Sequence, residues 1–350
     1  MEYIESSWSA AASQVPEDVL LLNVETTGLR PSSSFVCMIS AVYRKGDVLF
    51  SHTWLAGSRR DEEMLFKEIQ KLASSFPVIC TFGGNAFAFR FLRERLSIYS
   101  DASLFENSKL IDLQKTFRPL LRILPIDHLK KEDIEHFLGF HRHGVKTGKE
   151  LISVYQIWER DKSEDARDSM LLHAREDVCF LCEACKLNIY LDFLQTNWKE
   201  IHFEETPDGI LFHISLYSPV PAKAAWTNQY ADFSLSGHSA QVLAIPFSGQ
   251  LRYFLPGSCS DYYYLPAEDT AIHRSVAQFV DRKERVRATP ETCYINREGI
   301  FLPVPASLQG PLFHTSYRSV PAFTQFEKEK WQQDSSLAGK YLAAILQSSD

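Results

Sequence analysis

The sequence lacks the features of a membrane or exported protein. No stretch approaches the roughly 20 consecutive apolar residues that a membrane-spanning helix needs. The first ten residues, MEYIESSWSA, have neither a basic start nor an apolar core, so no signal peptide is expected. The seven cysteines are an odd number in 350 residues, which favours reduced thiols over a disulfide framework. We therefore expect a cytoplasmic protein with no membrane partner.

An excess of positive charge is also missing. Residues 1–199 carry 25 Lys and Arg against 28 Asp and Glu, residues 200–350 carry 12 against 16, and the net charge is −7. This balance argues against a tight, nonspecific DNA-binding protein, although a local groove can still be positive. Hydrophobic residues (45%) and charged residues (23%) are in the ordinary range for a soluble globular protein, and the length suggests two domains.

The predicted elements change in character near residue 200. Before it, a buried strand at 18–24 and a hairpin at 35–56 are followed by alternating helices and short strands, ending in a long helix at 166–194. This order predicts an α/β domain over residues 1–199, with a mixed central sheet flanked by helices.

Residues 200–350 are predicted to form a second, β-rich α+β domain. Alternating apolar and polar residues with Gly and Pro between them indicate several strands. Within this region we expect one clear helix at 267–286, a hairpin at 293–305 around NREG, and a last helix at 326–347. No function can be assigned to this domain from its sequence.

Four segments of the first domain carry motifs in a recognisable order. They are NVETTGL (23–29), TFGGNAFAFRFL (81–92), the region from LIDLQ (110–114) to GKELISVY (148–155), and LLHAREDVCFL (171–181). Together they resemble the YprB-type RNase H-like domain of the DEDD 3′→5′ exonuclease superfamily. The resemblance covers about residues 18–190 and implies the RNase H-like fold.

The resemblance also implies roles for individual residues. The family uses four carboxylates to hold two divalent ions, which activate a water and stabilise the leaving oxygen. Glu25 and Asp177 match two of these acids, and both would be metal ligands as well as catalytic residues. His173 matches a position that orients or deprotonates the water. Asp112 matches a position whose side chain usually supports the structure or the substrate from behind the metal ligands.

Two of the four acidic positions are replaced. Asn23 stands where the family has the aspartate shared by both metals, and Ala88 stands where it has the second-motif aspartate. An amide oxygen binds Mg²⁺ or Mn²⁺ without bringing charge, and alanine brings no ligand. We therefore expect one ion or none, and nuclease activity that is absent or reduced.

Three functional hypotheses follow. The leading one is a degenerate exonuclease domain that binds single-stranded DNA or RNA, or a nucleic-acid-processing partner. The second is an active metal-dependent 3′→5′ exonuclease with a reduced site. The third is a protein-interaction scaffold that binds no nucleic acid, since common descent does not imply a common activity.

The most basic segment of the chain is the candidate nucleic-acid surface. Residues 115–149 hold eight Lys or Arg and four acids. Within HRHGVKTGK, we expect Arg142, Lys146 and Lys149 to contact phosphates. A solvated basic face without a ligand is the alternative.

Three cysteines with a regular spacing form a further candidate site. Cys179, Cys182 and Cys185 have the C-x-x-C-x-x-C spacing of some iron–sulfur proteins, and Cys259 or Cys293 could supply a fourth ligand. Because the run continues a predicted helix, buried core residues are the preferred interpretation, and an iron or zinc site is the alternative.

Overall fold

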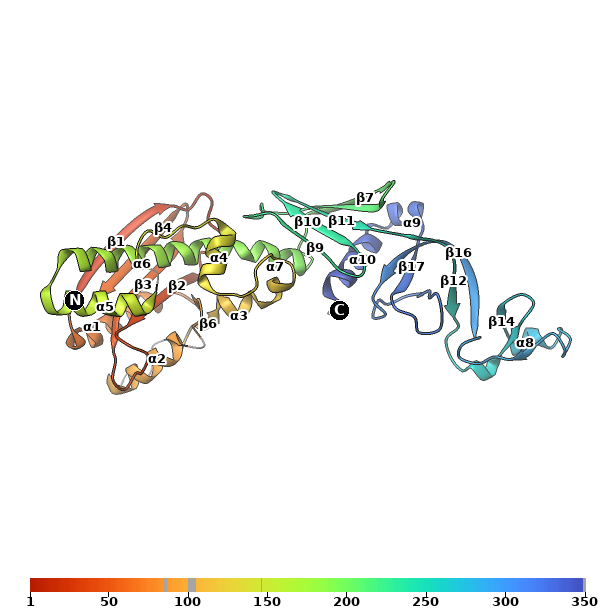
Figure 1. Ribbon diagram of the computed structural model, residues 1–350, viewed down its shortest axis with the longest axis horizontal. Coiled ribbons are helices and arrows are strands. Elements are labelled where there is room, and N and C mark those ends of the chain that lie inside the picture. Colours follow the sequence, from red (N-terminus) through yellow and green to blue (C-terminus); the bar gives the residue numbers. More distant parts are fainter. Residues whose placement is uncertain (85–86, 100–104, 146, 349–350) are drawn as a thin grey trace. The chain divides into compact units, whose positions relative to one another are not determined.

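The computed structural model describes residues 1–84, 87–99, 105–145 and 147–348. The chain divides into two compact units, Met1–Leu191 and Asp192–Asp350. Figure 1 labels their helices and strands. None of the described helices is both long enough and apolar enough to cross a bilayer.

The first unit is built on a mixed sheet with the strand order β1-β4-β3-β2-β5-β6. The first four strands in this order are antiparallel neighbours, whereas β2, β5 and β6 run parallel. The strand bounds are β1 Glu2–Ser9, β2 Val19–Thr26, β3 Val36–Lys45, β4 Val48–Leu55, β5 Val78–Thr81 and β6 Lys109–Asp112.

Helices flank this sheet. Their bounds are α1 Glu62–Ala73, α2 Ala88–Leu96, α3 Leu113–Thr116, α4 Lys131–Leu138, α5 Gly148–Asp161, α6 Glu164–Ala184 and α7 Asn188–Leu194. Short 3-10 turns cover Arg59–Asp61, Ser97–Tyr99, Arg118–Arg122 and Cys185–Leu187. The predicted α/β arrangement with a mixed central sheet is confirmed.

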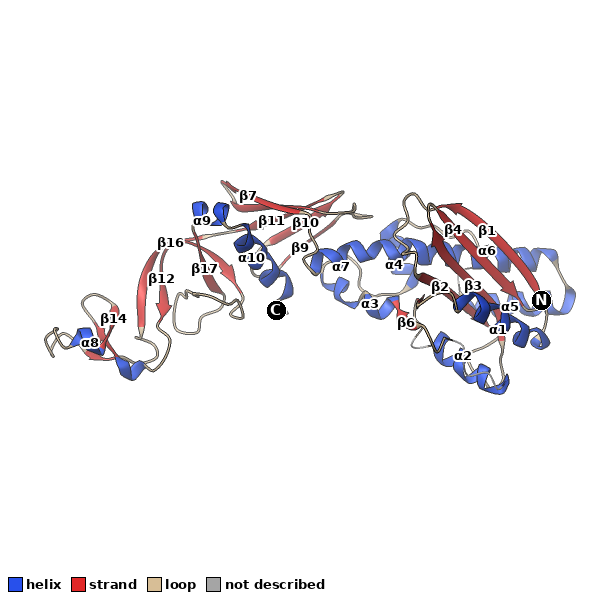
Figure 2. Cartoon of the chain, turned by 180° about the vertical axis from the view of Figure 1, so that it is seen from behind, coloured by secondary structure: helices blue, strands red, loops and turns tan. Residues whose placement is uncertain are grey.

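The longest helix, α6, places part of the site. Ser163 begins it by accepting a hydrogen bond from the Ala166 backbone N–H, as N-cap serines do. The helix packs along β2, β3 and β4, and Figure 2 shows it beside these strands from behind. Its buried face includes His173 and Asp177, so two polar side chains are held against the middle of the sheet.

The second unit contains three antiparallel sheets in its described part. Their orders are β7-β8-β11-β10-β9, β12-β16-β17 and β14-β13-β15. The strand bounds are β7 Glu200–Thr206, β8 Gly209–Ser215, β9 Ala224–Thr227, β10 Asp232–Ser236, β11 Ser239–Ala244, β12 Phe247–Phe254, β13 Tyr262–Leu265, β14 Thr270–His273, β15 Val286–Arg287, β16 Tyr294–Val304 and β17 Ala322–Phe326. The helices are α8 Arg274–Ala277, α9 Lys328–Gln333 and α10 Ser335–Gln347, with a 3-10 turn at Cys259–Asp261. The predicted β-rich character is confirmed.

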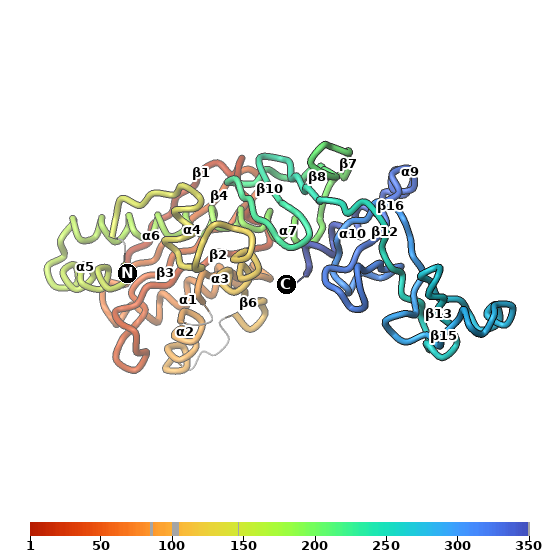
Figure 3. Tube along the Cα trace, turned by 45° about the vertical axis from the view of Figure 1, so that its right-hand side comes forward, coloured from red at the N-terminus to blue at the C-terminus, as the bar shows by residue number. Residues whose placement is uncertain are grey.

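The predicted helix at 267–286 is wrong. Thr270–His273 instead pairs with β13, and only four residues of the segment are α-helical. Asp269 has a positive φ of 48° at the turn, and its carboxylate accepts hydrogen bonds from the Tyr264 and Tyr294 hydroxyls. These contacts favour a hairpin over the helical spacing of the apolar residues. Figure 3 shows β13 beside β15, its other neighbour.

Three further sequence predictions need correction. The expected hairpin at 293–305 is one continuous strand, β16, because β12 pairs with Tyr294–Phe301 and β17 pairs with Ile300–Val304. The last helix starts at Lys328 and is interrupted at Asp334, which caps α10 by accepting from the Ser336 N–H. The N-terminal strand β1, which pairs with β4, was not predicted.

Candidate active site

Strand β2 presents two polar side chains on one face. Residues 19–22 are buried on both faces of the sheet, and from Asn23 onward burial alternates along the strand. Because side chains two apart on a strand point the same way, Asn23 and Glu25 face the same side. Both are partly buried, whereas Val24 between them is in the core.

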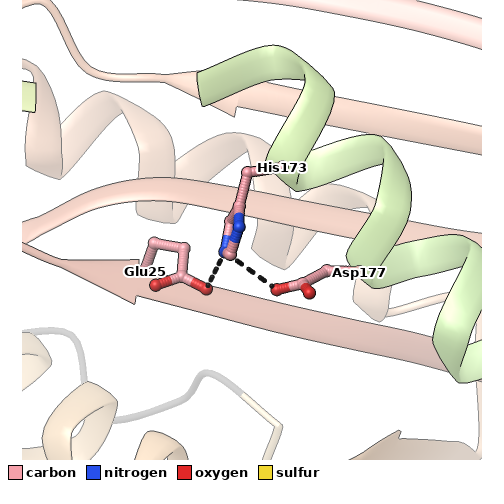
Figure 4. Close-up of side chains that lie close together, drawn as sticks. All are labelled: Glu25, His173 and Asp177. Carbon is pink, nitrogen blue, oxygen red and sulfur yellow. Dashed lines mark ion pairs between the residues drawn. The ribbon is translucent and has the colours of Figure 1, made fainter. Parts of the chain in front are cut away.

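Helix α6 completes a three-residue cluster. His173 and Asp177 are four residues apart and therefore share one helical face. The Nε2 atom of His173 lies 3.4 Å from Glu25 Oε1 and 3.4 Å from Asp177 Oδ2. Figure 4 shows the imidazole between the two carboxylates, one from β2 and one from α6. The fold thus brings together the three residues predicted to be catalytic.

Asn23 joins this cluster as a donor. Its Nδ2 atom donates to Glu25 Oε1 at 3.0 Å and to Asp177 Oδ2 at 2.7 Å. The Asn23 amide therefore links the carboxyl groups of Glu25 and Asp177 through hydrogen bonds.

Two basic side chains contact the other oxygen of Asp177. Lys131 Nζ, at the start of α4, donates to Asp177 Oδ1 at 2.9 Å, and an Arg142 terminal nitrogen lies 2.6 Å from the same atom. Arg142 also donates through Nε to Glu135 at 2.6 Å. The Arg142 side chain is 6% exposed and that of Asp177 is 1% exposed, so these ion pairs are screened little by water.

The loop that carries Arg142 is tied to α6. The backbone N–H of His143 donates to the Glu176 carboxylate at 2.6 Å. His173 Nδ1 lies 2.7 Å from the Val145 carbonyl oxygen, which makes Nδ1 the donor. The same helix therefore supplies the site residues and fixes the loop that brings the arginine to them.

The contacts shift the pKa of the buried groups in opposite directions. Burial favours a neutral imidazole, but the interactions with Asp177 and Glu25 outweigh it and raise the pKa of His173 to about 10. Burial alone would raise the pKa of Asp177, yet Lys131, His173 and Arg142 hold it well below its usual range. At neutral pH the site thus contains an imidazolium and a carboxylate in contact.

The charges of the cluster compensate one another. Three basic groups (Lys131, Arg142 and His173) face three carboxylic groups (Glu25, Glu135 and Asp177). Both oxygens of Asp177 already have donors or cations beside them. Neutralisation that a divalent ion would otherwise supply therefore comes from side chains.

A two-ion metal centre does not fit these residues. Within the described ranges, Glu25, His173 and Asp177 are the group of potential ligands whose atoms come within 4.8 Å of one another. His173 would have to lose its proton, and Lys131 and Arg142 would have to leave Asp177, before either residue could bind an ion. Two carboxylates and three cations are a poor electrostatic match for two dications.

The other predicted site residues have different positions. Ala88 begins α2 and packs against the hydrophobic core, so it offers no ligand. Asp112 is buried at the end of β6, where it caps α3 by accepting from the Gln114 N–H and also accepts from the Gly83 N–H. Through these contacts the Asp112 carboxylate holds the backbone of Gly83 and Gln114 in place.

The three predicted phosphate-binding residues do not form one exposed surface. Arg142 is buried in the ion pairs around Asp177, which makes it a poor phosphate contact. Lys149 is exposed on the first turn of α5. Lys146 lies outside the described residues.

The clustered cysteines lie on continuous helix. Cys179 and Cys182 belong to α6, and Cys185 begins the 3-10 turn that follows. Cys182 and Cys185 are buried, and burial raises the pKa of both thiols. The three are not among the described side chains that come close enough to share an ion.

Sequence reasoning missed Lys131 and assigned Arg142 a different role. Both are distant in sequence from Asp177, by 46 and 35 residues, and no local periodicity marks them. The excess of basic over acidic residues in 115–149 can be seen in the sequence, but only the fold shows which of the basic residues points inward.

Comparison with known proteins relates the first unit to a known fold. A model of the RNase_H superfamily matches residues 20–186. No curated protein matches the chain. Among solved structures, the family B DNA polymerase of the archaeon Pyrobaculum calidifontis is 11% identical, with 73% of this chain and 39% of that chain covered and a TM-score of 0.40.

Exonuclease I of E. coli is also among the similar structures. In its complex with a dT13 oligonucleotide, exonuclease I is 12% identical to this chain. The match covers 62% of this chain and 55% of exonuclease I, with a TM-score of 0.32. This chain thus spans about half the length of exonuclease I and less of the polymerase. Residues 20–186 thus match the model of the RNase_H superfamily, and the mixed sheet with its flanking helices has the RNase H-like fold.

Proposed function

We propose that the first domain is a degenerate DEDD-type exonuclease domain of the YprB kind, which binds single-stranded nucleic acid and has lost most or all nuclease activity. The observation that carries the proposal is the set of donors around Asp177. Asn23, Lys131, Arg142 and His173 surround the carboxylate that the family uses as a metal ligand.

The chemistry of strand cleavage explains the loss. Two-metal hydrolysis needs ions that hold the attacking water and the leaving oxygen. The contacts of His173 oppose a role as base, because Nδ1 donates to the Val145 carbonyl and the two carboxylates beside Nε2 raise the pKa of the ring. Lys131 and Arg142 compete with metal ions for Asp177.

The binding part of the proposal rests on a basic segment beside the cluster. Residues 113–131 contain five Lys or Arg and one acid, Asp127. Lys115, Arg118 and Lys130 are exposed, and the segment ends at Lys131, which contacts Asp177. Exposed cations attract phosphates with a strength that falls as salt rises.

A cytoplasmic location is part of the same proposal. All seven cysteines are free thiols, which fits a reducing compartment.

The test is degradation of 3′-labelled single-stranded DNA and RNA in the presence of Mn²⁺. We expect the natural chain to bind both strands or one of them and to leave the label intact. Two variants should gain cleavage. One is Asn23→Asp/Ala88→Asp, and the other adds Lys131→Ala to these two changes in order to free Asp177.

Two outcomes favour the other hypotheses. Degradation by the natural chain that disappears in Glu25→Gln/Asp177→Asn would mean an active exonuclease with a reduced site. A natural chain that binds no strand even at low salt would contradict the nucleic-acid proposal and favour a protein-interaction scaffold.

A further inference from the structure

A cavity of about 710 Å³ lies within the second unit, far in sequence from the site described above. Its lining comes from β12, β16 and β17, from the loop at 305–313, and from α9 and α10. Sites for small organic ligands in proteins are about 300–1,000 Å³ and combine apolar walls with a few polar groups. The cavity has the right size for one such ligand.

Aromatic side chains form much of its wall. They are Tyr253, Phe313, Trp331 and Tyr341. Trp331 packs edge-on against Phe326 at 5.1 Å between ring centroids, and Phe313 packs against Phe301 at 4.9 Å. These neighbours fix the rings in place, so the wall is preformed. Phe313 and Trp331 are 5% exposed and Tyr341 is 1% exposed, whereas Tyr253 is only partly buried and is the most accessible ring.

The exposed part of the lining is basic. Arg297, Lys330 and Lys340 line the cavity, against the single acid Glu327. In the part of the chain that the structure describes, none of the three cations has a carboxylate within 4 Å. The charges of Lys330 and Lys340 also act on Asp334, outside the cavity and without an ion pair, and the lining itself keeps a net positive charge that attracts an anion.

Polar groups with spare hydrogen-bonding capacity complete the lining. Gln309, Thr324 and Gln325 offer neutral donors and acceptors. Tyr341 is 1% exposed, and its hydroxyl has no hydrogen-bond partner among the described residues. A buried hydroxyl without a partner is unfavourable, which is the kind of feature found where a ligand is missing.

We propose that this cavity binds a nucleoside phosphate, either as a free nucleotide or as one nucleotide of a strand. Tyr253 would stack on the base above the buried rings, and the neutral side chains would meet the edge of the base. Lys330, Lys340 and Arg297 would hold the phosphate. A phosphate alone would not use the aromatic wall, and an uncharged ring would not use the three cations.

The cavity lies wholly within residues 253–341, so this proposal stands apart from the function of the RNase H-like domain. Nuclease assays with variants at Asn23 or Asp177 do not bear on it. Changing Lys115 and Arg118, two exposed residues of the basic segment 113–131, to glutamine would likewise leave nucleotide binding in the cavity unchanged.

The test is calorimetric titration of the full chain with adenosine 5′-monophosphate, thymidine 5′-monophosphate, adenosine, inorganic phosphate and a 5′-phosphorylated tetrathymidylate. The variant is Lys330→Gln/Lys340→Gln. The matched control is Lys199→Gln/Lys223→Gln, which removes two exposed lysines of the same unit outside the cavity. Thermal melting of both variants checks that they fold like the natural chain.

We expect at least one monophosphate or the tetranucleotide to bind, with affinity at least tenfold above that of adenosine or inorganic phosphate. The Lys330→Gln/Lys340→Gln variant should lose at least tenfold in affinity, and the control should not change. Binding of the monophosphates indicates a free nucleotide, and binding of the tetranucleotide alone indicates a strand. The proposal is overturned if neither binds, or if the cavity variant binds them as tightly as the control.

Discussion

Asn23 changes what its neighbours can do. As an amide it donates to Glu25 and Asp177 together, so it joins two carboxyl groups that lie side by side. His173, Lys131 and Arg142 add three positive charges around them. A buried ion-pair network of this kind is stable only while all its members are present, because the loss of one leaves another charge unpaired.

The pH dependence of stability reports on His173. An unperturbed histidine titrates near pH 6.5, whereas the pKa of His173 in the folded chain is raised to about 10. The protonated ring therefore stabilises the fold fully below about pH 6.5, and this contribution is lost as pH rises toward 10. Since one pKa unit corresponds to about 1.4 kcal/mol, the contribution is on the order of 5 kcal/mol.

Urea unfolding of the natural chain and of His173→Gln at several pH values between 6 and 9.5 measures this contribution. The difference in unfolding free energy should be large at pH 6 and shrink toward pH 9.5. His136→Gln, which alters an exposed histidine of α4, is the control and should follow the natural chain. Parallel curves for the natural chain and His173→Gln would refute the assignment of an imidazolium.

The sequence allowed part of this site to be predicted. Glu25, His173 and Asp177 occupy fixed positions in local motifs, and their periodicity places Glu25 on a strand face and the other two on one helical face. Lys131 and Arg142 come from a helix start and a loop whose paths depend on tertiary packing. Their inward direction could not be predicted because the basic segment has many similar residues and no pattern that separates buried from exposed ones.

At the scale of elements, a second buried ion pair holds the helices on the sheet. Glu62, at the start of α1, is fully buried and accepts hydrogen bonds from the Val36 backbone at 2.7 Å and from the Tyr99 hydroxyl at 2.7 Å. Arg95 of α2 pairs with it through Nε at 3.0 Å and also donates to the Pro31 carbonyl at 3.0 Å. The pair therefore links α1, α2 and the first residue of β3.

Removal of Arg95 should destabilise the first unit strongly. Arg95→Met leaves the Glu62 carboxylate buried without its cation, and the expected loss in unfolding free energy is about 3–5 kcal/mol. Arg90→Met on the same helix is the control, because its pair with Glu94 is exposed and should contribute under about 1 kcal/mol. Denaturant unfolding of the two variants decides the matter, and equal losses would contradict the role given to Glu62.

Helices and strands were predicted correctly where no tertiary contact opposed the local sequence pattern. The α6 and α5 helices and the β3–β4 hairpin follow strong local patterns. It failed at Thr270–His273 because a strand partner, β13, and the hydrogen bonds to Asp269 outweighed a helical spacing of apolar residues. It failed at β16 because the NREG sequence reads as a turn, whereas β12 pairs with all four of these residues and holds them extended.

At the scale of the whole molecule, the net charge of −7 and the proposed strand binding are compatible only if contact with phosphate is local. The segment 113–131 supplies that local charge. Each phosphate contact on a single strand contributes about −0.7 to the slope of log affinity against log salt concentration. A surface of a few basic residues therefore predicts weak, strongly salt-dependent binding.

The Lys115→Gln/Arg118→Gln variant tests this surface. Its slope should be less negative than that of the natural chain by about 1.4, for two lost phosphate contacts. Lys45→Gln/Lys71→Gln removes the same charge from exposed positions elsewhere on the first unit and should leave the slope unchanged. Fluorescence anisotropy with labelled oligothymidylate at about 25–200 mM salt gives both slopes. Equal slopes for the two variants would mean that Lys115 and Arg118 do not contact the phosphates of the strand.

The most direct measurement is a titration of the full chain with Mn²⁺, followed by calorimetry and by the electron paramagnetic resonance of the free ion. The account predicts no binding in the natural chain, because side-chain cations already neutralise Glu25 and Asp177. It predicts binding in Asn23→Asp/Ala88→Asp/Lys131→Ala, where carboxylates are restored and a cation is removed. Mn²⁺ binding by the natural chain that is lost in Asp177→Asn would contradict the account.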